Sequence, residues 1–172
     1  IVIGNFDTSS LTKAQCDVLE KWVDNGGTLI LAGGPNAGKV YSGLQDGLNP
    51  FTIQGPAVSV PASALGTFTE KTFSEGTISV VQGNKGDGEV LIKHDETPLA
   101  INYRKGKGVI SVLTFDPSLS PVSNWENVSL FWQKYLKETS AYMISNSALD
   151  QDYLGGLSRD ISDFQYMASR VP

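Results

Sequence analysis

Cysteine and histidine are almost absent from this chain, which contains one of each among its 172 residues. The single cysteine, Cys16, excludes an internal disulfide and a metal site built from several cysteines. No apolar run approaches the roughly 20 residues needed to cross a bilayer. We therefore expect this segment to be soluble and to fold without covalent or metal cross-links.

Basic residues are scarce relative to acidic ones. Thirteen Lys and Arg stand against eighteen Asp and Glu, so the formal net charge is −5, and the two signs are interspersed along the chain. Binding to a nucleic acid backbone needs a concentrated basic face, so we expect no nucleic acid partner. The length suits one packed domain. Because the chain opens on an apolar strand without a Met, we expect a longer polypeptide that supplies upstream strands.

The first 34 residues have the pattern of a strand, a helix and a second strand. An apolar run at 1–3 precedes helical spacing over 12–24, where Thr12 and Gln15 fit a capping box. A Gly pair follows the helix, and 28–31 is an unbroken apolar run typical of a strand buried on both faces. Such short links predict a parallel crossover.

One stripe of this helix is apolar and is expected to pack on the sheet. Its residues are Leu11, Val18, Leu19, Trp22 and Val23. This spacing predicts that the Trp22 side chain is wedged between the helix and the sheet.

The rest of the chain changes character several times. The segment 50–76 is rich in Gly, Pro, Ser, Thr and Ala and is expected to be an irregular excursion. Short strand-like runs separated by Gly-rich or charged turns then predict an antiparallel meander, so the sheet is mixed; these runs are 77–81, 89–93, 98–103 and 109–115. An amphipathic helix is expected over 124–138, and two short helices broken at Gly155 and Gly156 over 147–170.

Polar side chains and glycines follow several of the predicted strands. Ligands of open parallel sheets bind outside the carboxyl ends of the strands. The residues that we expect to converge on one crevice there are Asn5, Asp7, Gly33, Gly34, Asn36 and Asp116. Asp7 and Asp116 would then form a carboxylate pair for acid–base chemistry or for a hard cation. The alternatives are a turn cap at Asp7 and an Asp-Pro turn at Asp116.

The segment 33–39 has the glycine and lysine frame of a phosphate-binding loop, from Gly33 to Lys39. However, Val40 stands where a Ser or Thr hydroxyl should ligate Mg²⁺, and the following residues are too rich in Gly for a long helix. A surface loop with a solvated Lys39 is therefore favoured over nucleotide binding.

Two stretches resemble a known superfamily. The stretch 1–34, IVIGNFDTSSLTKAQCDVLEKWVDNGGTLILAGG, is similar to class I glutamine amidotransferase-like domains, in which a helix and a Trp/Tyr-Val-x-x-Gly-Gly motif precede the buried strand before the nucleophile elbow. The stretch 98–136, PLAINYRKGKGVISVLTFDPSLSPVSNWENVSLFWQKYL, resembles the closing strands and helix of a non-catalytic branch found in membrane-anchored proteins of Gram-positive bacteria. The resemblance implies a three-layer, flavodoxin-like and amidotransferase-like α/β domain.

The glutaminase triad does not carry over. Active amidotransferases place a cysteine at the elbow and a His-x-Glu pair downstream, whereas this chain has Gly33, Gly34 and Pro35 at the elbow and no histidine near its end. The resemblance therefore implies a catalytically degenerate domain, with no catalytic residue, cofactor or metal.

The hypothesis that follows is a binding or scaffolding module of a membrane-anchored bacterial protein. Residues 1–140 would form the amidotransferase-like domain, and 141–172 a helical extension towards a membrane anchor. The module would face the outside of the cell, bind a small ligand or a protein partner, and reach the membrane only through segments outside this chain. The alternatives are a hydrolase that uses Asp7 and Asp116 and nucleotide binding between Gly33 and Lys39.

Overall fold

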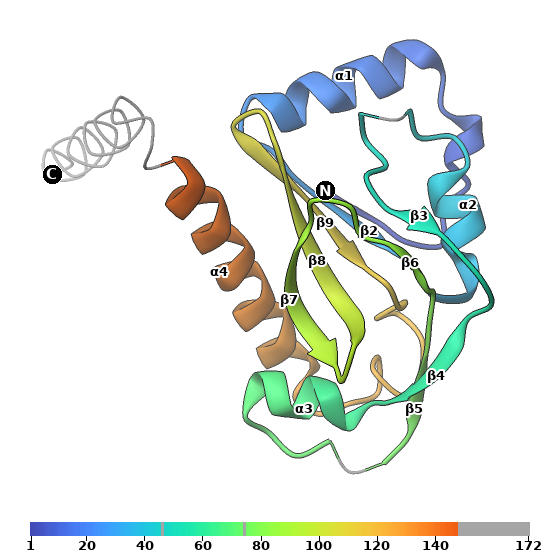
Figure 1. Ribbon diagram of the computed structural model, residues 1–172, viewed down its shortest axis with the longest axis vertical. Coiled ribbons are helices and arrows are strands. Elements are labelled where there is room, and N and C mark those ends of the chain that lie inside the picture. The colour runs from blue at the N-terminus through green and yellow to red at the C-terminus, as the bar shows by residue number, and fades with distance from the viewer. Residues whose placement is uncertain (46, 74, 148–172) are drawn as a thin grey trace, which may run out of the picture.

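A five-stranded mixed sheet forms the centre of the computed structural model, which describes residues 1–45, 47–73 and 75–147. The strand order is β1-β2-β9-β8-β7 (Figure 1), and the bounds are β1 (Val2–Ile3), β2 (Thr28–Ala32), β9 (Gly108–Leu113), β8 (Thr97–Lys105) and β7 (Glu89–His94). β1, β2 and β9 run parallel, whereas β8 pairs antiparallel with both β9 and β7. The α/β class and the mixed sheet are thus confirmed.

The predicted crossover is present at the start of the chain. β1 and β2 are parallel neighbours joined through η1 (Thr8–Ser10) and α1 (Lys13–Asp24). The capping box is confirmed. The Thr12 side chain accepts from the backbone N–H of Gln15, and the backbone N–H of Thr12 donates to the side chain of Gln15. This reciprocal pair satisfies amides that the first helical turn leaves without partners.

The predicted inner face of α1 is only partly right: Val23 lies in the core and Leu11 and Leu19 pack against it, but Val18 and Trp22 do not. Val23 is fully buried and Cys16 nearly so, whereas Trp22 is 40% exposed and Val18 is 67% exposed. Glu20, which lies outside the predicted apolar stripe, is half-buried instead, and Lys105 of β8 donates to its carboxylate at 2.6 Å.

Val18 and Trp22 instead line an open apolar groove together with Ile1, at the unpaired edge of the sheet. The Trp22 indole lies against Gly27, where an added Cβ would be 2.5 Å from the ring. Trp22 therefore covers a backbone turn and does not fill the core.

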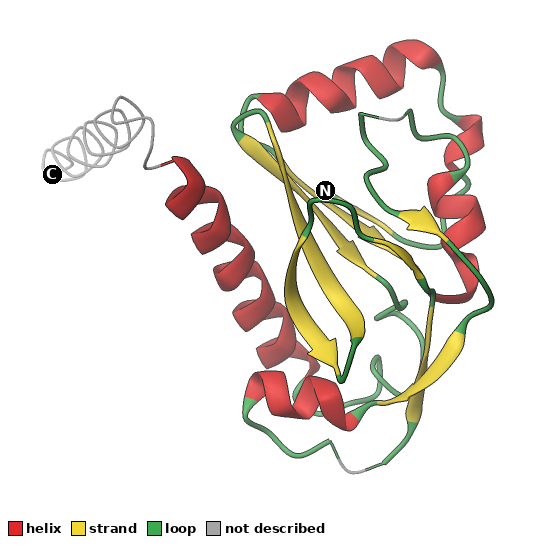
Figure 2. Cartoon of the chain, in the orientation of Figure 1, coloured by secondary structure: helices red, strands yellow, loops and turns green. Residues whose placement is uncertain are grey.

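Helices pack against both faces of the sheet (Figure 2). α1 and the short α2 (Ala37–Tyr41) share one hydrophobic cluster with Leu29 and Leu31 of β2. α3 (Ser63–Thr69) and α4 (Val128–Ser147) share the other cluster with Ile30. Because successive side chains of a strand point to opposite faces, the unbroken apolar run of β2 serves both clusters.

The middle of the chain is more regular than expected. The segment 50–76, which we expected to be irregular, contains α3. β4 (Val58–Pro61) pairs with β5 (Thr77–Val80) in a separate antiparallel ribbon, so the run at 77–81 does not belong to the main sheet. A second small ribbon joins β3 (Thr52–Ile53) to β6 (Gly83–Asn84). Exposed and buried residues alternate along β4 and β5, as expected for a ribbon with one exposed face.

The last described element is α4, which begins four residues later than the predicted helix and continues to Ser147. The expected domain boundary at residue 140 therefore falls inside a continuous helix. Two short helices were expected over 147–170; Ser147 is the last residue of α4, and the rest of that range lies outside the described residues. Within the described part of the chain, no helix is long and apolar enough to cross a membrane.

Candidate functional site

The loop after β9 places Asp116 at the carboxyl end of the parallel strands. Thr114 anchors this loop, since its hydroxyl donates to the Pro98 carbonyl at 2.8 Å. The Thr114 carbonyl in turn accepts from the Val81 amide at 2.8 Å, which ties the end of β5 to the end of β9. The ribbon of β4 and β5 is therefore held beside the Asp116 loop.

The Asp116 carboxylate is buried, with 5% of the residue exposed, and its two oxygens differ. Oδ1 accepts from the Ser118 amide at 2.9 Å and from the Ser118 hydroxyl at 2.6 Å. Oδ2 is also buried, but it has no hydrogen-bond partner among the residues that the structure describes. An unsatisfied buried oxygen costs about 1–3 kcal/mol, and more when it is charged, so a partner for this atom would be stabilising.

A pocket of about 260 Å³ opens beside Asp116. The hydroxyl-bearing residues that line it come from the ribbon and the loop and are Ser59, Thr77, Ser79 and Ser120. Apolar residues, among them Pro35 and Leu119, complete the lining. The volume lies near the lower limit of ligand pockets, which span roughly 300–1,000 Å³. The pocket therefore suits a small molecule or one end of a longer one.

Of the two predicted glycines, Gly34 lies against Asp116, whereas Gly33 lies against Leu113 and Thr114. The amides of the two glycines donate to the carbonyls of Leu113 and Thr114 at 2.7 and 3.1 Å, which extends the pairing between β2 and β9. Gly34 has φ +68°, and a Cβ there would lie 2.8 Å from the Asp116 amide nitrogen. A side chain at the elbow would therefore collide with the Asp116 backbone.

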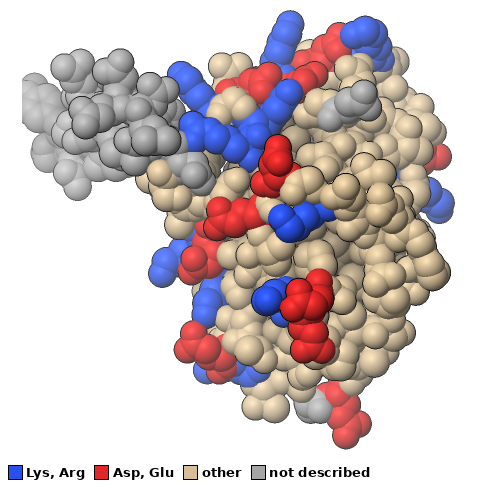
Figure 3. All heavy atoms as spheres, viewed as in Figure 1, with Lys and Arg blue, Asp and Glu red and all other residues tan. Residues whose placement is uncertain are grey.

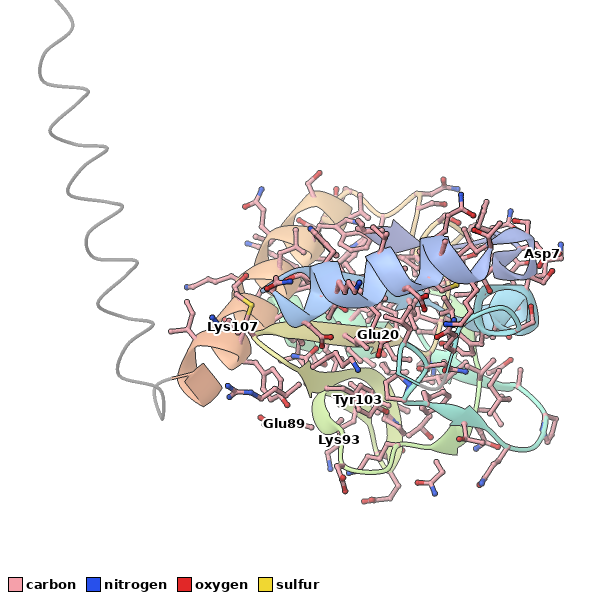
Figure 4. All side chains as sticks on the ribbon, turned by 90° about the horizontal axis from the view of Figure 1, so that it is seen from above. Asp7, Glu20, Glu89, Lys93, Tyr103 and Lys107 are labelled. Atoms are coloured by element: carbon pink, nitrogen blue, oxygen red, sulfur yellow. The ribbon has the colours of Figure 1, made fainter. Side chains whose placement is uncertain are left out.

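Asp7 takes the capping role that we had considered as its alternative. Its carboxylate accepts from the Ser9 amide and hydroxyl at 3.0 and 2.6 Å, at the start of η1. Both hydrogen bonds lower the pKa of Asp7, and the bond from the Ser9 hydroxyl has the larger effect. Figure 4 shows Asp7 at the outer end of the fold beside α2.

The predicted crevice is thus only partly assembled. The described residues that line the Asp116 pocket do not include Asn5, Asp7 or Asn36. No group of three or more His, Cys, Asp or Glu side chains suited to a metal ion occurs in the described part of the chain.

The segment 33–39 does not have the geometry of a phosphate-binding loop. It forms η2 (Gly34–Asn36) and then α2, a helix of five residues in which Val40 is buried and Lys39 is exposed. The amides of Gly33 and Gly34, which would help to cradle a phosphate, donate instead to carbonyls at the end of β9 and just after it. The exposed Lys39 agrees with the favoured interpretation, although the segment is more helical than a plain loop.

Sequence reasoning missed the pocket residues contributed by the ribbon, namely Ser59, Thr77 and Ser79. The available signal was the alternation of small hydroxyl residues with Val and Ile over 58–60 and 77–80. This alternation indicates strands with one polar face, and Ser59 pairs directly with Ser79.

Comparisons with known proteins support the fold alone. No protein-family model matches the chain, and no curated protein matches it. Cytoplasmic protein STM1381 from Salmonella typhimurium LT2 is similar in structure, with a TM-score of 0.59 and 16% identity over 81% of this chain and 71% of that one. Cytoplasmic protein STM3548 from Salmonella typhimurium has a TM-score of 0.61 and 16% identity, over 81% and 70% of the two chains.

Proposed function

We propose that this domain is a non-catalytic binding module that holds the positively charged amine of a small ligand against Asp116. The observation that carries the proposal is the buried carboxylate of Asp116, a residue that lines a pocket and whose Oδ2 has no hydrogen-bond partner among the described residues. Burying an unpaired carboxylate is unfavourable, whereas a cation that donates to it offsets the loss of hydration.

An ammonium group suits the rest of the pocket. Its remaining N–H groups can donate to hydroxyl oxygens of Ser59, Thr77 or Ser79, which lie on the exposed face of the ribbon. Apolar residues such as Leu119 and Pro35 would then contact the carbon chain of the ligand. No Lys or Arg lines this pocket among the residues described, so no protein cation competes for Asp116.

Two features of the chain support a role without catalysis. The only thiol, that of Cys16, is buried on α1 and donates to the Gly43 carbonyl at 3.7 Å. The elbow carries Gly34, where a nucleophilic side chain would clash with Asp116. The resemblance to non-catalytic amidotransferase-like domains leads us to propose further that the module belongs to a membrane-anchored bacterial protein and faces outward.

The second candidate is a hydrolase with a cation at Asp116. A hard cation such as Ca²⁺ takes six to eight oxygen ligands, and Asp116 offers one spare carboxylate oxygen. Because Asp7 is not part of the pocket lining, this candidate would need hydroxyls and water for every other ligand.

Calorimetric titration separates the two candidates. We expect n-butylamine hydrochloride to bind with millimolar affinity, n-butanol not to bind, and Asp116→Asn to abolish binding of the amine. Ca²⁺, Mg²⁺ and Mn²⁺ should give no heat beyond dilution. Equal amine binding by the native chain and Asp116→Asn would refute the proposal, and cation binding that Asp116→Asn removes would favour the hydrolase.

A further inference from the structure

A second, larger hollow adjoins the Asp116 pocket. Its volume is about 440 Å³, and Ser120 lines both hollows. Residues 72, 73 and 75 and residues 120, 121 and 124–126 line the outer hollow, and the inner one adds 77–79, 115, 116 and 119 together with Pro35 and Ser59. Gly76 and Pro121 hold the segments 72–79 and 115–126 close, since a Cβ on Gly76 would lie 2.9 Å from the Pro121 ring. The two hollows therefore lie side by side and share a wall at Ser120; together they are called the groove below.

The outer hollow is acidic at its rim and aromatic at its floor. Glu75 and Glu126 line it and are exposed, and no Lys or Arg lines it among the described residues. On the face shown in Figure 3, charges of both signs are otherwise interspersed. The floor is rigid, because the Trp125 ring stacks on Phe73 at 4.5 Å and its indole N–H donates to the Thr72 carbonyl at 3.1 Å.

We infer that the ligand of this groove is a linear dication, such as an alkyl diamine. This inference rests on the proposed function, since one ammonium would donate to Oδ2 of Asp116. The methylene chain would pass Ser120, and the second ammonium would lie between Glu75 and Glu126, above the Trp125 ring. Carboxylates at the rim and an aromatic face beneath attract a cation. The buried Asp116, which lines the inner hollow and has one oxygen without a partner among the described residues, distinguishes this groove from an ordinary acidic surface.

The test compares ligands that differ at one end only. Putrescine carries two ammonium groups, aminobutanol one ammonium and one hydroxyl, and n-butylamine one ammonium and a methyl. Titration calorimetry at low ionic strength should show that putrescine binds about three- to tenfold more tightly than the other two. This gain is expected when a second ammonium group pairs with two partly exposed carboxylates.

Three acid-to-amide variants locate the two ends. Asp116→Asn should weaken all three amines by at least about tenfold, since the buried acceptor is lost. Glu75→Gln and Glu126→Gln should each weaken putrescine about two- to fivefold and leave n-butylamine unchanged. Glu96→Gln, at the exposed turn between β7 and β8, is the matched control for net charge and should change neither.

The outcomes separate the two claims. If putrescine and n-butylamine bind equally well and both depend on Asp116, the dication is refuted while the proposed function stands. The dication is also refuted if Glu75→Gln and Glu126→Gln have no more effect than Glu96→Gln. If none of the amines binds the native chain, both claims fail together.

Discussion

Two valines on α1 provide a matched test of how this helix packs. Val23 is fully buried among residues of β2 and β9, whereas Val18 is 67% exposed. Replacing either by Ala removes the same atoms and raises intrinsic helix propensity by the same amount, at most about 0.6 kcal/mol. Any difference between the two variants therefore reports burial alone.

The expected difference follows from the buried atoms. Removing two methyl groups from a packed site costs about 1.6 kcal/mol in transfer free energy, and the cavity left behind raises the loss to about 2–3 kcal/mol. For a domain of this size, Val23→Ala should lower Tm by about 5–10 °C. Val18→Ala should stay within about 0.5 kcal/mol of the native chain, as exposed substitutions usually do.

Urea unfolding followed by circular dichroism measures both free energies of unfolding. Equal losses in the two variants, or a larger loss for Val18→Ala, would mean that α1 is rotated relative to the sheet. Trp22→Ala, which truncates a half-exposed indole, should cost less than the ~3–5 kcal/mol typical of a buried Trp.

The remaining predictions concern Asp116, Cys16 and Lys105. Asp116→Asn keeps the Oδ1 acceptor for Ser118 and should unfold within about 0.5 kcal/mol of the native chain, whereas Asp116→Ala should lose about 1–3 kcal/mol; a large loss for both in urea titration would make Asp116 purely structural. Cys16 is buried, so a thiol reagent should label it only after denaturant is added, and rapid labelling of the folded chain would contradict the packing of α1. The Glu20 carboxylate raises the pKa of Lys105, so the pair stabilises the fold at neutral pH and loses its effect as pH rises above about 10. The difference in Tm between the native chain and Lys105→Met should therefore shrink in that range, and a constant difference would argue against the ion pair.

Local signals predicted much of the central sheet. The capping box at Thr12 and the apolar run of β2 are properties of short segments, and both are confirmed. The turns that separate β7, β8 and β9 likewise predicted their antiparallel pairing. These features depend on backbone preferences and alternation, which a single sequence displays.

Features set by tertiary packing were not predictable in the same way. An apolar stripe shows which side of α1 is apolar, but the packing of the helix on the sheet decides whether Trp22 or Cys16 is buried. α3 was missed because its Ser, Thr and Gly residues have low helix propensity. Its Leu65 packs in the hydrophobic core, a tertiary contact that the local sequence does not show.

The candidate site divides along the same line. The carboxyl-end rule grouped Asp116 with Gly34, and these two residues do lie against each other. It could not show that Asp7 bonds to Ser9, because that depends on the local turn. The ribbon that completes the pocket pairs residues about twenty positions apart, such as Ser59 and Ser79, which no local pattern specifies.

The most direct test of the central claim is an amide-resolved NMR titration with n-butylammonium chloride, using sodium chloride as the ionic control. The reporter is the Ser118 amide, which donates to Oδ1 of Asp116 at 2.9 Å. We predict saturable shifts of the Ser118, Ser120 and Ser79 amides in the native chain and none in Asp116→Asn. Shifts that are absent, equal with sodium chloride, or unchanged in Asp116→Asn would contradict a ligand site at Asp116.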